Sequence, residues 1–357
     1  MMNHLNKAQR AVAIWVIAGV VMLLVQVVLG GVTRLTGSGL SITEWNVLKK
    51  SGYLPPIGQA EWQAEFDKYK KTPQFLLVNS DFSLENFKFI YFWEWFHREW
   101  AKLIAVVFVV GFIFLLAKGY LKASVIKPLI ILFLLGAMQG LIGWIMVLSG
   151  LTDDMIYVKP LKLALHFVFA LVLICYAWWF SMQLWVDNRK LTEANSLRRY
   201  SWAILIVLFF QLIYGALMAG HKAGPAAATW PTINGSWWPE GIFNNGVNLV
   251  ENRITIHFIH RALAYILFIL TLLFTIKAFS RGGSGSYLRQ TKLLPMLLIT
   301  LQVLLGIFTV LTSTGIRPNH WVLFDWLAQF HQVIGLLFMM VMVWTLYITK
   351  VNRYSYR

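Results

Sequence analysis

Four histidines lie inside long apolar stretches of this sequence: His97, His166, His260 and His331. Ionisable residues in apolar segments that cross a membrane are costly, and they are usually functional. Two imidazoles that face each other at equal depth in a helical bundle provide the axial ligation that a haem iron needs. The spacing therefore predicts two metal-ligand pairs, His97 with His166 and His260 with His331.

Two other interpretations of these histidines fit the sequence less well. A single intramembrane histidine is often only a hydrogen-bonded polar residue between helices, but four at matched depth favour the ligand interpretation. Zinc would need four nitrogen, sulfur or oxygen ligands at each site, and no carboxylate or thiolate accompanies three of the histidines. The only cysteine, Cys175, excludes an intramolecular disulfide and a CxxC pair.

Glu94 lies three residues before His97 and so on the same helix face. A carboxylate beside a ligand histidine can act as a base or a proton relay. The alternative is a charge at the membrane boundary, paired with Arg98 or Lys102. In the second part of the chain His257 takes the equivalent position, as a second donor or a packed ring.

Arg98 and Arg261 directly follow two of the histidines, and a guanidinium there could bind a haem propionate through two hydrogen bonds. The alternative for each is a side chain that extends to the lipid headgroups. A Gln-x-x-x-Gly motif also recurs at Gln26–Gly30, Gln139–Gly143, Gln211–Gly215 and Gln302–Gly306. Close helix packing alone would explain these glycines.

The elements that carry these residues are membrane spans. The 357 residues are 58% apolar and only 13% charged, about half the charge of a soluble chain. Stretches long enough to cross a bilayer run over 11–31, 89–117, 128–149, 161–185, 200–220, 254–279, 293–313 and 326–349. The first is too long for a signal peptide and no cleavage site follows it, so we interpret it as a retained helix. The sequence predicts an all-α polytopic membrane protein.

The net charge of +16 indicates orientation rather than nucleic-acid binding. Most Lys and Arg residues fall in the N-terminal tail, the even-numbered connections and the C-terminal tail, so both termini are predicted to face the cytoplasm. The long connections 32–88 and 221–253 then lie outside. All four histidines fall near the outer ends of their helices, in the outer leaflet.

The chain is predicted to consist of two pseudo-symmetric four-helix bundles. The Gln-x-x-x-Gly motifs occur in the odd-numbered spans and the histidines in the even ones, and 260 − 97 equals 302 − 139, both 163. We define the N-terminal half as residues 1–190, with the long outer loop 32–88, and the C-terminal half as residues 191–357.

Several motifs resemble the haem A synthase family, in the mitochondrial and proteobacterial-like class that lacks loop cysteine pairs. They cover nearly the whole chain and comprise Gly31-Val-Thr33-Arg34-Leu-Thr-Gly-Ser38-Gly39-Leu-Ser41, Pro55-Pro56, Glu61-Trp62, Glu94-x-x-His97-Arg98, Leu165-His166, Trp230-Pro231, His260-Arg261 and Ala328-Gln329-Phe330-His331-Gln332. The resemblance implies an oxidoreductase acting on CH or CH2 groups. It would oxidise the C8 methyl of haem O to a formyl group, through a hydroxymethyl haem, and so make haem A for a terminal oxidase.

The resemblance also implies residue roles. His97 and His166 would bind the substrate haem O, with Glu94 as the catalytic carboxylate. His260 and His331 would ligate a haem b cofactor that passes electrons. Arg34, Arg98 and Arg261 would contact the haems.

Two positions depart from the family pattern. His221-Lys222 and Ala226-Ala227-Ala228 replace the usual acidic and Asn positions of the connection after the fifth span, and His257 replaces a common Gln. These changes affect contacts to the C-terminal haem, but neither removes a ligand.

Two other functions remain open on the sequence. One is a bis-histidine cytochrome that carries electrons between quinol and a partner, and the other is a haem carrier without catalysis. Expected partners are the lipid bilayer, an electron acceptor and a haem O synthase, with no nucleic acid; a homo-oligomer is compatible with the sequence. A bacterial inner membrane is favoured, because the N-terminus lacks the composition of a mitochondrial presequence.

Overall fold

The computed structural model describes residues 2, 4–44, 54–152, 155–242, 248–281, 283–317 and 320–350. Throughout these residues the chain is helical and contains no β-strand. Eight helical segments are long and apolar enough to cross a membrane, which confirms the predicted all-α polytopic fold. Seven are single helices: α1 (Lys7–Leu35), α4 (Leu84–Ala117), α5 (Ala123–Leu148), α6 (Pro160–Trp185), α7 (Asn195–Gly220), α9 (Arg253–Phe279) and α12 (Leu323–Ile348). The seventh segment joins the short α10 (Tyr287–Thr291) to α11 (Leu294–Leu311).

Local signals set the outer ends of the histidine-bearing helices. Ser83 caps α4 by accepting a hydrogen bond from the backbone N–H of Asn86, and Asn252 caps α9 in the same way. Pro160 occupies the first turn of α6, where its missing N–H costs nothing. Asp325 accepts from the backbone N–H of Val322 at the start of α12. Each helix therefore begins close to the predicted boundary.

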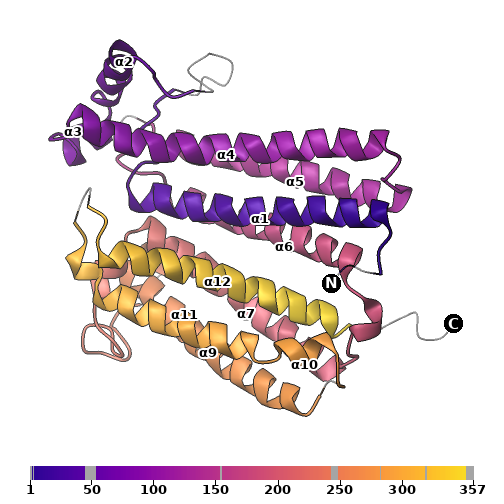
Figure 1. Ribbon diagram of the computed structural model, residues 1–357. Coiled ribbons are helices and arrows are strands. Elements are labelled where there is room, and N and C mark those ends of the chain that lie inside the picture. Colours follow the sequence, from indigo (N-terminus) through magenta and orange to yellow (C-terminus); the bar gives the residue numbers. More distant parts are fainter. Residues whose placement is uncertain are drawn as a thin grey trace.

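The helices form two neighbouring groups (Figure 1). In the first, α1 packs on α4 and α6, and α5 packs on α6; in the second, α7 and α11 each pack on both α9 and α12. The groups meet where α6 contacts α7 and α12, and where α1 contacts α12. This pairing does not conflict with the predicted four-helix halves, whose pseudo-symmetry stays a prediction.

Two short helices from the 32–88 connection, α2 (Gln59–Tyr69) and α3 (Pro73–Val78), cover one end of the molecule (Figure 1). Phe66, Tyr69, Phe87 and Tyr91 bury their rings together and fix these helices on α4. Both chain termini lie at the opposite end of the bundle. The 32–88 connection is thus an ordered cap over much of its described length.

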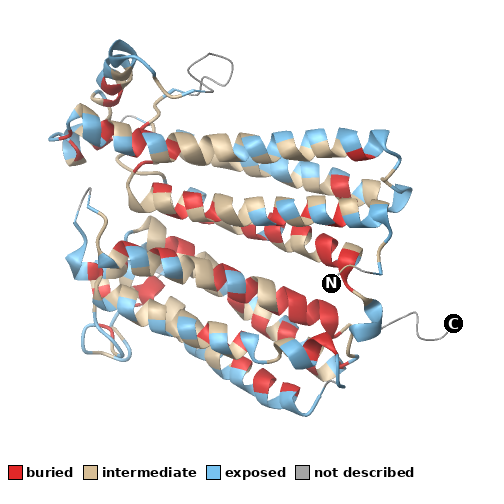
Figure 2. Ribbon diagram, in the orientation of Figure 1, coloured by how far each residue is buried: buried red, intermediate tan, exposed pale blue. Residues whose placement is uncertain are grey.

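The buried core is unevenly distributed (Figure 2). It concentrates where α12 packs against α6 and α7, and its largest cluster includes Trp185, Leu197, Phe274, Phe338 and Trp344. By contrast, few residues of α4 and α5 are buried, as expected for helices that face lipid. The contact between the two groups of helices is therefore the best-packed part of the molecule.

Candidate haem-binding site

All four histidines line one cavity, whose walls come from helices of both groups. Its volume is about 1140 Å³, which exceeds the roughly 300–1,000 Å³ of a single small-molecule pocket. Glu94, Arg34, Arg98 and Arg261 line the same cavity. The structure therefore brings together every site residue that the sequence singles out.

The C-terminal pair has the spacing of two ligands on one metal ion. The ring centroids of His260 and His331 are 6.3 Å apart, and the rings are inclined by 66°. Two imidazoles on opposite sides of one metal ion, at about 2 Å per bond, have centroids about 6 Å apart. The pair thus fits axial ligation of a single iron.

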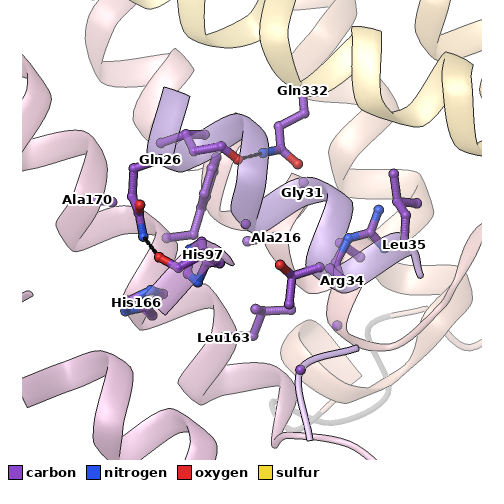
Figure 3. A pocket seen from close by; sticks show the side chains of 18 of the residues that line it. Gln26, Gly31, Arg34, Leu35, His97, Leu163, His166, Ala170, Ala216 and Gln332 are labelled. Atoms are coloured by element: carbon purple, nitrogen blue, oxygen red, sulfur yellow. Dashed lines mark hydrogen bonds between the residues drawn. The ribbon is translucent and has the colours of Figure 1, made fainter. Parts of the chain in front are cut away.

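The N-terminal pair is formed by His97 of α4 and His166 of α6, which lie close together beneath α1 (Figure 3). Gln26 of α1 donates from Nε2 to the backbone oxygen of His97 at 3.1 Å. The ring of His97 points toward Gly30, and that of His166 lies beside Gly143. Two histidines from two different helices can therefore reach one group in the cavity.

The donor sets suit a porphyrin better than a bare metal ion. Among the described residues, no group of three or more His, Cys, Asp or Glu side chains could hold a metal ion. Each histidine pair supplies only two nitrogens, so the other ligands must come from the bound group itself, as four porphyrin nitrogens do in a six-coordinate haem. The apolar walls of the cavity also match the body of a haem.

Glu94 is buried, with 2% of its surface exposed, and all of its described partners are hydrogen-bond donors. Its Oε2 accepts from the Ser41 hydroxyl at 2.7 Å and from the backbone N–H of Ile42 at 2.8 Å. Its Oε1 pairs with the guanidinium of Arg98, as the boundary-charge alternative expected. These bonds tie the start of the outer connection to α4 and hold a charge at the wall of the cavity.

His257 makes the equivalent contacts in the C-terminal half. Its Nε2 donates to the backbone oxygen of Ala223 at 2.8 Å, and its Nδ1 lies 3.4 Å from the Arg261 guanidinium. The imidazole is fully buried. In both halves, the residue one turn before the ligand histidine anchors an outer connection and contacts the arginine four residues later.

Arg98 and Arg261 also bind these connections. Arg261 donates to the backbone oxygens of Ala227 at 2.8 Å and Thr232 at 3.2 Å. Arg98 donates to the backbone oxygen of Ile42 at 3.4 Å. Both guanidiniums therefore hold the connections over the cavity, a role that the sequence did not indicate.

Arg34 has a different environment. Within the described residues, its guanidinium makes no hydrogen bond or ion pair, although Asp325 attracts it electrostatically. It lies on α1 beyond the histidine pair and lines the cavity (Figure 3). Of the three arginines, it is the one with donors to offer to a bound anion.

Lys222 is a cavity residue that the sequence marked only as a departure from a family pattern. Its ammonium lies 3.3 Å from the ring centroid of Tyr157. Burial, with repulsion from Arg34 as a smaller cause, lowers the pKa of Lys222 to about 8. Lys222 and Arg34 thus place two cations near each other at the cavity wall.

Comparison with known proteins identifies the family of the chain. A family model described as a cytochrome oxidase assembly protein (COX15-CtaA) matches residues 13–343. A haem A synthase of Flavobacterium johnsoniae is 37% identical over 352 residues, covering 96% of this chain and 99% of the relative. A haem A synthase of Rhodospirillum centenum is 38% identical and covers 96% of this chain and 89% of its own length. That of Paracoccus denitrificans is also 38% identical, with 86% and 82% covered.

Proposed function

Because the chain belongs to the cytochrome oxidase assembly protein family that the COX15-CtaA model describes, we propose that it is a haem A synthase. It converts haem O to haem A by oxidising the C8 methyl group to a formyl group, through a hydroxymethyl haem. The reaction places the protein among oxidoreductases that act on CH or CH2 groups. The observation that carries this proposal is the match over nearly the full length of relatives bearing this name.

The two histidine pairs bind different haems. His97 and His166 hold the substrate haem O, because Glu94 lies one helical turn from His97 on the same face and lines the same cavity. His260 and His331 hold a haem b, which when bound supplies a one-electron redox centre. In the C-terminal half the position equivalent to Glu94 is occupied by His257 and not by a carboxylate, so this half lacks the corresponding proton acceptor.

Glu94 accepts a proton from the substrate methyl or hydroxymethyl group. Ser41, Ile42 and Arg98 fix its carboxylate, so the group is preorganised rather than free to rotate. Water is limited by the cap that α2 and α3 form near the start of α4. Glu94 thus moves a proton while the substrate carbon is oxidised and an electron acceptor receives the electrons.

The carboxylates of the bound haems are held by Arg34 and Lys222. Both are cationic below pH 8, lie at the seam between the two groups of helices, and line the cavity that holds the histidines. A guanidinium can bind a carboxylate with two parallel hydrogen bonds. Arg98 and Arg261 support this arrangement indirectly by holding the outer connections.

The protein works in a bacterial inner membrane with both termini in the cytoplasm. The excess of basic residues near the termini and the even-numbered connections supports this orientation. The histidine pairs then lie toward the outer leaflet. The haem O synthase that makes the substrate and an acceptor of electrons are the partners that this reaction requires.

A direct test is to co-express the protein with a haem O synthase in a host that lacks haem A. Mass spectrometry of the extracted haems should find formyl and hydroxymethyl haem. Folded, haem-loaded protein that yields neither would contradict the proposal. That outcome would favour a bis-histidine membrane cytochrome, which the matched pair in each half could also support, or a non-catalytic haem carrier.

A further inference from the structure

Each ligand histidine lies against the glycine of a Gln-x-x-x-Gly motif on a neighbouring helix of its own half. A Cβ added to these glycines would come within 2.8 Å of His166 Cε1 at Gly143, 2.9 Å of His331 Cε1 at Gly306, 3.2 Å of His97 Nε2 at Gly30, and 3.3 Å of His260 Cε1 at Gly215. Real Cβ atoms essentially never approach closer than 3.0 Å, so a side chain at Gly143 or Gly306 would displace the imidazole. Helix packing alone does not explain why all four glycines meet a histidine.

The glutamine of each motif reaches the same histidine. Gln139 Nε2 lies 3.2 Å from His166 Nδ1, and Gln211 Nε2 lies 3.3 Å from His260 Nε2. Gln302 Nε2 lies 3.2 Å from His331 Nε2. In the fourth motif, Gln26 instead contacts the backbone oxygen of His97. The glutamine and the glycine therefore contact one histidine together in every motif.

His331 illustrates what this contact achieves. Its Nδ1 donates to the backbone oxygen of Gln302 at 3.0 Å, beside Gly306, which has no side chain to obstruct the ring. A proton on Nδ1 leaves the lone pair of the neutral imidazole on Nε2, which lies 3.2 Å from Gln302 Nε2; iron bound at Nε2 would replace this contact. Metal-ligating histidines generally use their second nitrogen in this way, which fixes ring orientation and tautomer.

All four glutamines also retain an unused acceptor. The side-chain Oε1 atoms of Gln26, Gln139, Gln211 and Gln302 are buried and have no hydrogen-bond partner within the described residues. An unpaired buried acceptor costs about 1–3 kcal/mol. Rotation of a glutamine amide exchanges its donor and acceptor, so Gln139, Gln211 and Gln302 can each pair with an imidazole in either tautomer. Three of these glutamines lie beside the imidazole itself, and Gln26 lies beside the backbone of its histidine.

We propose that each Gln-x-x-x-Gly motif is the positioning element of one axial histidine. The glycine opens the space into which the imidazole fits, and the glutamine contacts the ring or the backbone of the same histidine and so fixes the position of the ring. This inference rests on the proposed function only in that the histidine pairs bind haem. Neither the glutamines nor the glycines act on the substrate.

The first test compares two glycines on α5. Gly143→Ala and Gly140→Ala make the same change one turn apart, but an added Cβ at Gly140 meets nothing within 4 Å. Purified variants are titrated with haemin and followed by absorption and electron paramagnetic resonance spectroscopy. Gly143→Ala should weaken haemin binding by the N-terminal pair about 10–100-fold, the range for lost support of a metal ligand. Gly140→Ala should bind as the wild type does.

The C-terminal pair gives the matching test on the resident haem. Gly306→Ala and Gln302→Leu should each shift the low-spin resonance signal and the midpoint potential of that haem, and accelerate its loss to a haem-scavenging globin about 10–100-fold. A purely structural role would lower thermal stability without shifting the signal or the potential of the folded fraction. Wild-type spectra in Gly143→Ala, Gly306→Ala and Gln302→Leu would overturn the inference.

A double variant covers the case in which Gly306→Ala does not fold. If the added methyl group clashes with the imidazole, Gly306→Ala should cost no stability in a His331→Ala background, where the ring is gone. An equal loss in both backgrounds would overturn the inference. A wild-type protein that binds no haemin at either pair would instead contradict the proposed function, so the two failures are distinguishable.

Discussion

The two halves of the molecule differ most at the helix pair on their lipid-facing side. In the C-terminal half α9 and α11 pack together and close the bundle. In the N-terminal half α4 and α5 make little backbone contact and are joined by side chains: the rings of Phe108 and Phe133 stack with centroids 6.2 Å apart, and Leu115 and Leu129 belong to one buried cluster. The C-terminal bundle is therefore closed more tightly on this side than the N-terminal bundle, where small residues also lie between α4 and α5.

The region between α4 and α5 reaches the cavity. Ala101 and Ala105 of α4, and Gly136 and Gly140 of α5, line the cavity and are also exposed at the surface. A hydrophobic substrate could pass from the bilayer between these small residues, which leave space that larger side chains would fill. A more loosely closed half suits a haem that enters and leaves, whereas a tightly closed half suits a haem that stays.

The second difference is the residue one turn before the ligand histidine. Glu94 and His257 hold equivalent positions and make equivalent ties to an outer connection, but only Glu94 is a carboxylate. The scaffold therefore does not need a carboxylate at this position. The charge of Glu94 is instead available for proton chemistry, which the following substitutions test.

Glu94→Gln should produce the largest effect on activity. The amide keeps the size of the side chain but cannot accept a proton, and the loss of a general base typically costs about 10²–10⁴-fold in rate. Haem A formation should fall by at least about 100-fold while the protein still binds haem O. Product is measured by mass spectrometry and binding by absorption spectroscopy. Glu85→Gln, at an exposed position on the same helix, is the control and should leave the rate unchanged.

His260→Ala and His331→Ala should deplete the purified protein of its resident haem b. Each leaves a single axial ligand in a closed bundle, so haem content measured by pyridine haemochromogen should fall about 10-fold or more. His97→Ala and His166→Ala should leave the resident haem in place. The reverse pattern would show that the roles of the two halves are exchanged.

A large side chain between α4 and α5 should lower the affinity for haem O more than the content of haem b. Gly140→Trp inserts a large ring between α4 and α5, and we expect the apparent affinity for haem O to fall about 10-fold at unchanged haem b content. Gly140→Ala is the matched control. Equal substrate affinity in Gly140→Trp would indicate that haem O enters elsewhere.

The sequence predicted the spans, which the structure confirms, and it singled out four histidines and Glu94, which the structure places on one cavity, because long apolar runs and the polar residues within them are local signals. It could not predict that α4 and α5 make fewer backbone contacts than α9 and α11 do. All four helices are similarly apolar, and only their packing distinguishes the two pairs. The Gln-x-x-x-Gly recurrence was visible, but its contact with the histidines depends on helix rotation. The sequence also suggested that Arg98 and Arg261 bind propionates, whereas their described hydrogen bonds run largely to loop carbonyls, which no residue pattern specifies.

The smallest expected effect concerns Lys222, which sits at the seam of the halves. Burial and Arg34 lower its pKa to about 8, so below pH 8 it is a cation and above pH 8 it becomes neutral. Its contribution to carboxylate binding is therefore present at pH 7 and lost as the pH rises to 9, about fivefold in affinity for an ion pair worth ~1 kcal/mol. The neighbouring groups Arg34, Asp325 and Tyr157 are unchanged by the substitution Lys222→Met. That variant should bind haemin about fivefold more weakly than the wild type at pH 7 and equally at pH 9, as measured by titration. If the wild-type affinity stays constant from pH 7 to 9, the haem carboxylates do not bind at Lys222 between the two halves and must lie within one half.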